Sequence, residues 1–251
     1  MSGTLAGPTA NDDQVKSAKT DAPKSIVTRR QELERQVREH ALDIDLYLEL
    51  AAIHRSEDRP LEARRLLQQA LQLSKDDPRV LWEFEEATLA RSLQQFREVT
   101  DLASRLHTAE VERELKRSQQ DWANRRLEVC RARLERDPAK QQLRLVVAEA
   151  LYDLGIFKEA IEELQPCLEI ETLSCAAYLI QGKCLLDDGK ELESLASFRA
   201  VAMRRSTVAP AKVRAMAMRS AVEIANRFNL TLSAERYRHA LEAAEHELAK
   251  S

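Results

Sequence analysis

Apolar side chains recur every three or four residues along most of this chain, which is the spacing of an amphipathic α-helix. Two consecutive stretches, residues 141–174 and 175–208, carry the same pattern at an offset of 34 residues. Their glycines, Gly155 and Gly189, fall at the same place in each stretch and fit a turn between antiparallel helices. Self-similarity at this period predicts an array of stacked helix pairs, because one pair cannot bury its apolar face alone.

The same pattern divides the rest of the chain into segments of unequal regularity. Residues 1–26 carry almost no large apolar side chains, so we expect a disordered tail that cannot offset its own ordering entropy. Helical periodicity begins at Val27, and residues 27–250 form the expected helical domain. Its predicted segments are good repeats at about 44–77, 141–174 and 175–208, a degenerate region at 79–138 and a closing helix pair at 211–249.

The stretch 108–136 is the least regular part of the domain, being densely charged with sparse apolar positions. Nothing in it breaks a helix, so it fits either one long helix or two helices with a break near residues 118–121. We favour a degenerate repeat over a protruding coiled coil, because heptads are not sustained over three turns of the pattern.

One stretch, residues 44–77, carries a more specific pattern of large and small apolar residues. Small residues at set positions let paired helices approach closely, while larger ones fill the gaps. The pattern resembles that of the tetratricopeptide repeat (TPR) family, and the residues that match it are Tyr47, Leu50, Ala51, Ala63, Leu67 and Ala70. Two residues depart from the family's pattern, because Asp58 stands where the family usually has Gly and Pro78 arrives three residues late. The resemblance covers about residues 28–249 and implies an all-α, right-handed superhelical solenoid of antiparallel helix pairs.

The chain offers no recognisable constellation of catalytic residues. Five scattered glycines cannot build a phosphate-binding loop, and the five histidines never form an H-E-x-x-H motif. His239 and His246 lie on one predicted helix, and we interpret them as surface residues rather than metal ligands. We therefore expect no enzymatic activity, no cofactor and no metal. With 39 basic and 42 acidic residues, the net charge of −3 predicts no polyanion partner.

The cysteines indicate a reducing compartment. None of them forms a C-x-x-C pair, and three stand where a repeat core takes a small apolar residue, so we expect buried free thiols rather than metal or redox chemistry. The four are Cys130, Cys167, Cys175 and Cys184. Residues 1–25 show no secretory signal pattern, and no window approaches 18 consecutive apolar residues. These features predict a cytoplasmic protein without a membrane partner.

The resemblance also implies where a partner would bind, since the first helix of each pair lines the concave face in the TPR family. The equivalent positions here are Leu48, Ala52, Arg55, Leu145, Glu149, Tyr152, Leu179, Lys183 and Leu186. Family members that clamp the C-terminal carboxylate of chaperones use Lys and Asn at two of these positions, and no repeat of this chain has that pair. We therefore expect a mostly apolar groove for an amphipathic helix or an extended apolar segment. The alternative is that the three leucines pack between neighbouring helices.

These observations favour a non-catalytic adaptor or assembly scaffold that binds a protein or peptide segment of unknown identity. One alternative is a self-associating structural module that pairs through terminal helices or the stretch 108–136, and the sequence leaves the oligomeric state open. A second alternative is an RNA-binding repeat protein, although a solvated basic patch is the simpler interpretation. The basic cluster that would serve it is Arg199, Arg204, Arg205, Lys212 and Arg214.

Overall fold

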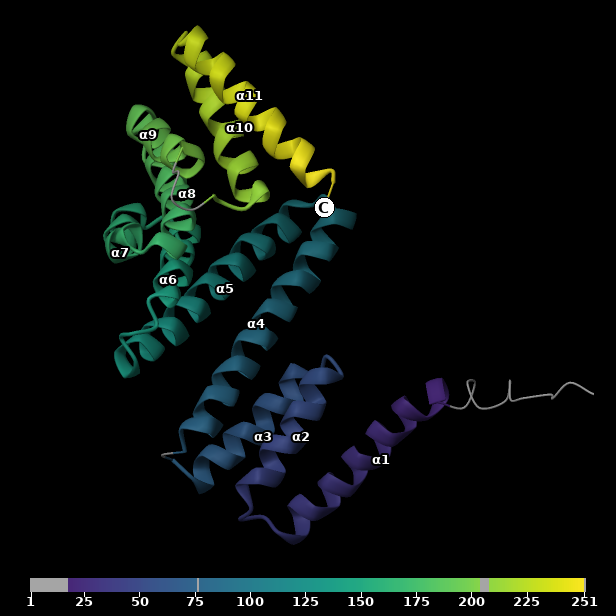
Figure 1. The fold of residues 1–251 in the computed structure, drawn as a ribbon. Helices are drawn as coiled ribbons and strands as arrows, with labels where there is room; N and C mark the ends of the chain where they lie inside the picture. The colour runs from purple at the N-terminus through teal and green to yellow at the C-terminus, as the bar shows by residue number, and fades with distance from the viewer. Residues whose placement is uncertain (1–17, 76, 204–207, 251) are drawn as a thin grey trace, which may run out of the picture. The chain divides into compact units, whose positions relative to one another are not determined.

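The computed structural model describes residues 18–75, 77–203 and 208–250, with side chains for residues 26–75, 77–202 and 208–250. The described residues form eleven helices and no strand (Figure 1). The chain divides into two compact units, unit 1 up to Arg91 and unit 2 from Ser92. The helices are α1 (Ala18–Glu39), α2 (Ile44–Ser56), α3 (Pro60–Leu73), α4 (Pro78–Arg105), α5 (Ala109–Arg136), α6 (Gln142–Asp153), α7 (Phe157–Glu169), α8 (Glu171–Asp187), α9 (Glu191–Met203), α10 (Ala211–Arg227) and α11 (Thr231–Leu248).

The first helix begins earlier than the sequence predicted. We expected a disordered tail through residue 26, but residues 18–26 belong to α1. Several of them are Ala or Lys, which have high helix propensity and extend the amphipathic segment toward the N-terminus. The rest of the expected tail, residues 1–17, lies outside the described residues.

Unit 1 packs α1, α2, α3 and the first part of α4 around one small core. Leu33 of α1 is fully buried, and Asp43 caps α2 by accepting a hydrogen bond from the amide of Asp45 at 3.1 Å. The core cluster consists of Tyr47, Ala51, Ala63, Leu67, Ala70, Val80 and Ala87. Five of these seven belong to the good repeat at 44–77, whose pattern therefore describes how α2 and α3 pack.

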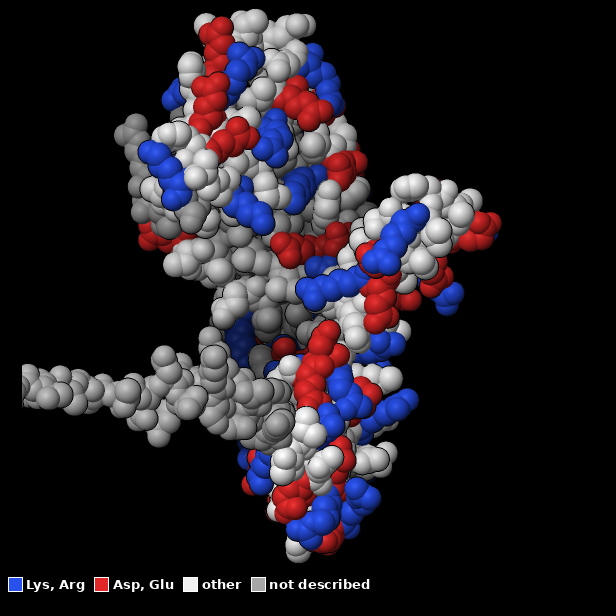
Figure 2. Space-filling view, turned by 90° about the vertical axis from the view of Figure 1, so that its right-hand side faces the viewer, with Lys and Arg blue, Asp and Glu red and all other residues white. Residues whose placement is uncertain are grey.

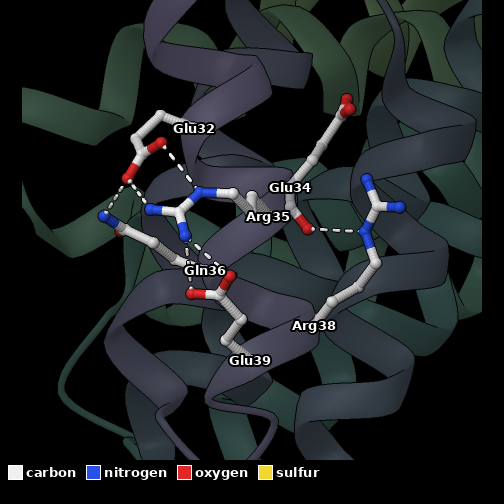
Figure 3. A network of polar contacts seen from close by, with 6 residues as sticks. All are labelled: Glu32, Glu34, Arg35, Gln36, Arg38 and Glu39. Carbon is white, nitrogen blue, oxygen red and sulfur yellow. Dashed lines mark hydrogen bonds and ion pairs between the residues drawn. The ribbon is translucent and has the colours of Figure 1, made fainter.

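Basic and acidic side chains are interspersed over the face shown in Figure 2, and α1 shows how they pair. On this helix Arg35 donates to Glu32 at 2.8 Å and to Glu39 at 2.6 Å, as Figure 3 shows. Such pairs one turn apart give a solvent-exposed helix a small local stabilisation. Arg29 instead contacts Glu49 of α2 at 2.7 Å, and Arg30 contacts Glu57, the residue that follows α2, at 2.5 Å.

Two helices of 28 residues each, α4 and α5, occupy the degenerate region. Each is a single helix, so α5 has no break near residues 118–121. Counting the period onward from 44–77 places Glu85 where good repeats have Ala or Gly, and Ser92 where they turn the chain. Glu85 is buried, with 7% of its surface exposed, and the chain continues past Ser92 as one helix to Arg105 instead of turning.

Unit 2 contains the stacked helix pairs that the period predicted. The antiparallel pairs are α6/α7, α8/α9 and α10/α11, and α5 packs beside α6. Each second helix also packs on the next first helix, α7 on α8 and α9 on α10. The first helices contact each other as well, α6 with α8 and α8 with α10, so they lie side by side along one face. This arrangement confirms the predicted all-α architecture of stacked helix pairs.

The turns within the helix pairs share one backbone geometry. Gly155 and Gly189 have φ values of 77° and 80°, and Asp58 and Asn229 reach 57° and 55° at equivalent places. In each turn the amide of this residue donates to the carbonyl three residues before it, and the next amide donates to the carbonyl five residues before that amide. Asp58 therefore adopts the positive φ that Gly155 and Gly189 adopt in their turns. Asn229 marks the turn between the two helices of the last pair.

Candidate functional site

A line of polar side chains crosses the first helices of unit 2 and the neighbouring α5. We name it the polar strip, and its members are Arg126 of α5, Glu149, Tyr152 and Asp153 of α6, and Lys183 and Asp187 of α8. Arg126 forms an ion pair with Asp153, and the Tyr152 hydroxyl donates to Asp187 at 2.7 Å. Asp153 and Asp187 are equivalent residues one repeat period apart. Asp153 links α6 to α5, and Asp187 links α8 to α6.

Arg126 is held in place from several sides. Only 12% of its side chain is exposed, and its guanidinium lies 5.0 Å from the centroid of the Trp122 ring. This cation–π contact and the Asp153 ion pair fix the position of the positive charge. A fixed charge of this kind can orient a partner at little entropic cost.

Glu149 has a different environment from its neighbours. Its side chain is exposed, but the surrounding protein raises the pKa of its carboxyl by desolvation. Arg126 and Lys183 oppose this rise in the pKa through their positive charges, and Asp153 adds to it. The Glu149 carboxylate is therefore reachable by solvent and at the same time crowded by protein.

Burial raises the pKa of Tyr152 well above its ordinary value, and the hydrogen bond that its hydroxyl donates to Asp187 raises this pKa further. The Tyr152 ring lies 5.9 Å from the ring of Phe157, between their centroids. Tyr152 is thus a neutral, oriented side chain at physiological pH, and it lies three residues after Glu149, about one turn further along α6.

The predicted groove leucines do not form an open apolar surface. Leu179 is only 8% exposed and belongs to the core that α8, α9, α10 and α11 share. Leu145 and Leu186 are partly buried against the cores of unit 2. The expectation of a mostly apolar groove is therefore wrong for Leu179, because α10 covers this position from the next pair. Leu179 packs between neighbouring helices, as the alternative interpretation predicted. The exposed face of the first helices is therefore more polar than expected.

The predicted positions in unit 1 differ in how far their side chains are buried. Leu48 is partly buried against the unit 1 core, and Ala52 is exposed. Arg55 forms an ion pair with Glu83 of α4, and Arg79 contacts Asp45 at 3.0 Å. These ion pairs hold α2 and the first part of α4 together within unit 1.

Three residues of the predicted basic cluster lie among the described residues. Arg199 and Lys212 are exposed on α9 and α10, whereas Arg204 and Arg205 lie outside the described residues. Arg214 donates to the carbonyl of Ala209 at 3.0 Å and forms an ion pair with Glu247 of α11. Its charge is thus used within the last helix pair.

All four cysteines are buried as free thiols. Burial raises the pKa of the Cys184 thiol to about 12 and also raises that of Cys167. Such thiols behave as small apolar core residues. Across residues 18–75, 77–203 and 208–250, no group of three or more His, Cys, Asp or Glu residues is placed to hold a metal ion. Over the same described ranges, no helix combines the length and the apolarity that crossing a bilayer requires.

Comparisons with known proteins give a distant structural similarity. No family model matches the chain, and no curated protein matches it. A solved structure of YrrB, described as a TPR protein with an unusual peptide-binding site, is 17% identical with a TM-score of 0.49. The match covers 84% of this chain and 91% of that chain. Similarity at this level carries neither a partner nor a binding residue over to this chain.

Proposed function

We propose that this protein is a non-catalytic interaction scaffold of the TPR type that binds a segment of a partner protein at the polar strip of unit 2. The observation that supports this proposal best is the position of Glu149 on the strip. Its side chain is exposed and burial by the surrounding protein raises the pKa of its carboxyl, whereas Arg126 and Tyr152 already have partners in Asp153 and Asp187. A partner group that donates to Glu149 would recover solvation that the folded chain has lost.

The strip offers a recognisable order of chemical groups to such a segment. Leu145 lies one helical turn before Glu149 on α6 and stays partly exposed, and Lys183 lies on the adjacent α8. An apolar side chain over Leu145 and a donor at Glu149 would define the register, while Lys183 would donate to a carboxylate or a backbone oxygen of the segment. Complementary charges of this kind contribute more to specificity than to affinity.

Charge reversal on the strip tests this proposal. We expect Glu149→Lys and Lys183→Glu each to lower recovery of one common partner at least tenfold in affinity capture from the native host. Both positions are solvent-accessible, so the circular dichroism spectrum should stay unchanged. Glu162→Lys, an exposed position on α7, is the matched control and should recover the partner at the wild-type level. Equal recovery by all three variants would show that the strip is not the binding site.

A further inference from the structure

A second surface of unit 2 shares no residue with the polar strip. It is an open hollow of about 590 Å³ where the turn between α8 and α9 meets the end of α10. Its lining consists of Gly189, Lys190, Glu191, Leu192, Glu193, Arg227 and Phe228. We name it the turn-edge hollow.

Large apolar side chains gather at the turn-edge hollow. Leu192 and Phe228 line it with 58% and 43% of their surfaces exposed. Leu230 and Leu232 follow Phe228 in the next turn and the start of α11, with 40% and 82% exposed. Single exposed leucines are common on protein surfaces, but four large apolar residues within two neighbouring turns indicate an interaction site.

Two acidic and two basic side chains line the hollow, and the carboxylates of Asp188 and Glu223 lie beside them. Lys190 pairs with Asp188 at 2.7 Å, and Arg227 pairs with Glu191 of α9 and lies 3.6 Å from Glu223. Both basic groups at the hollow therefore already face carboxylates. Glu193 adds a further exposed carboxylate in the first turn of α9.

The helix ends at the hollow also favour a positive charge in a bound ligand. Both α8 and α10 end here, and the C-terminal end of a helix favours a positive charge. The positive N-terminal end of α9 is offset by Glu191 and Glu193 in its first turn. A bound cation would therefore meet an acidic rim and two helix C-termini.

We propose that the turn-edge hollow binds a peptide segment in which apolar side chains alternate with Lys or Arg. The apolar side chains contact Leu192 and Phe228, and a basic group pairs with Glu193. Gly189 leaves room for this contact, because a Cβ at that residue would meet no atom within 4 Å. The hollow thus gives the scaffold a second contact that is independent of the polar strip.

A peptide titration of the full-length, ¹⁵N-labelled protein tests this proposal. The probe is a capped pentapeptide of alternating lysine and leucine, and its counterpart has glutamate in place of lysine. We expect the lysine peptide to shift the amide signals of Gly189, Leu192 and Phe228 saturably. The glutamate peptide should bind at least tenfold more weakly because the rim repels it.

Substitutions separate this contact from adventitious binding. Leu192→Ser and Glu193→Lys should each weaken the lysine peptide at least fivefold, whereas Leu42→Ser in unit 1, a leucine 82% exposed, should not. Equal shifts with both peptides, or shifts that persist in both hollow variants, would overturn the proposal. Concentration-dependent shifts of the same amides without peptide, with a doubled mass in light scattering, would identify a self-interface instead. Glu149→Lys should leave the titration unchanged, so failure of the polar strip and failure of the hollow are distinguishable.

Discussion

At the scale of single residues, Gly182 shows why a repeat needs small side chains at set positions. A Cβ at this glycine would lie 2.6 Å from Cε1 of the fully buried Phe198 ring. The Ser194 hydroxyl also donates to the Gly182 carbonyl at 2.9 Å, which fixes the approach of α9 to α8. Ala148 holds the equivalent position in the preceding repeat, so the size limit at Gly182 comes from its particular neighbour.

We therefore predict that Gly182→Ala destabilises the protein by about 1–3 kcal/mol, since the ring must shift in a packed core. Urea unfolding monitored by circular dichroism measures this free energy of unfolding. Alanine has the higher helix propensity, so a purely local effect would stabilise the protein by up to about 1 kcal/mol. An unchanged or raised midpoint would show that Phe198 does not restrict this position.

The buried His54 makes the stability of unit 1 depend on pH. Only 5% of its surface is exposed, its Nδ1 atom has no hydrogen-bond partner among the described residues, and burial lowers its pKa. The unfolded chain then binds a proton at a higher pH than the folded chain does. We predict that stability falls as the pH drops below about 6.5, the ordinary pKa of histidine, toward the folded value.

Unfolding in urea at pH 7.5 and at pH 5.5 measures this loss of stability. His54→Leu should reduce the loss, because it removes the titrating group without adding a buried polar atom. His239→Gln, at an exposed histidine of α11, serves as the control and should leave the loss unchanged. A loss of equal size in His54→Leu and in the wild type would contradict this origin.

At the scale of elements, the turns depend on residues that reach positive φ. Asn229 adopts a φ of 55° without being glycine, and an L-residue in this region costs roughly 1 kcal/mol, less for Asn than for most. We predict that Asn229→Gly raises the free energy of unfolding by up to about 0.5 kcal/mol. Gly155→Ala, at a φ of 77°, should lower it by about 1 kcal/mol. Thermal unfolding of both variants measures these changes. If both substitutions shifted the free energy of unfolding in the same direction, the two turns would not share one backbone geometry.

Much of this element order can be predicted from sequence, because the period of 34 residues and the turn glycines are local signals. The continuation of α4 was also signalled, by Glu85 at a position for small residues and by Ser92 in place of a turn glycine. The burial of Leu179 could not be predicted from its own repeat, because the covering residues come from α10. Arg126, Asp153 and Asp187 of the polar strip were not predicted. Arg126 lies on a helix outside the good repeats, so the repeat pattern does not place it beside α6.

At the scale of the whole molecule, the array is uneven. Good pairs stand at 44–77 and 141–208, and the long helices α4 and α5 occupy the stretch between them. The second half of α4 ends in exposed apolar residues, with Leu102 45% and Leu106 49% exposed. Local stability follows buried apolar contacts, so this part of α4 should open more readily than α6 or α8.

Hydrogen exchange measures this difference. We predict that amides within residues 92–105 exchange at least tenfold faster than those in the middle of α8, because the latter lie between two core clusters. Residues in the middle of α5, such as Ala123, which is fully buried, provide an internal reference on another long helix. Equal protection of α4 and α8 would mean that the long helix is stabilised by contacts beyond those described.

The central claim is that a partner segment lies on the polar strip of unit 2, and site-specific photo-crosslinking in the native host tests it most directly. A benzophenone amino acid at Leu145, beside Glu149, should form a covalent adduct with one protein partner. The same probe at Glu162 on α7 should give no such adduct. An adduct of equal yield from both positions, or from Glu162 alone, would contradict the claim.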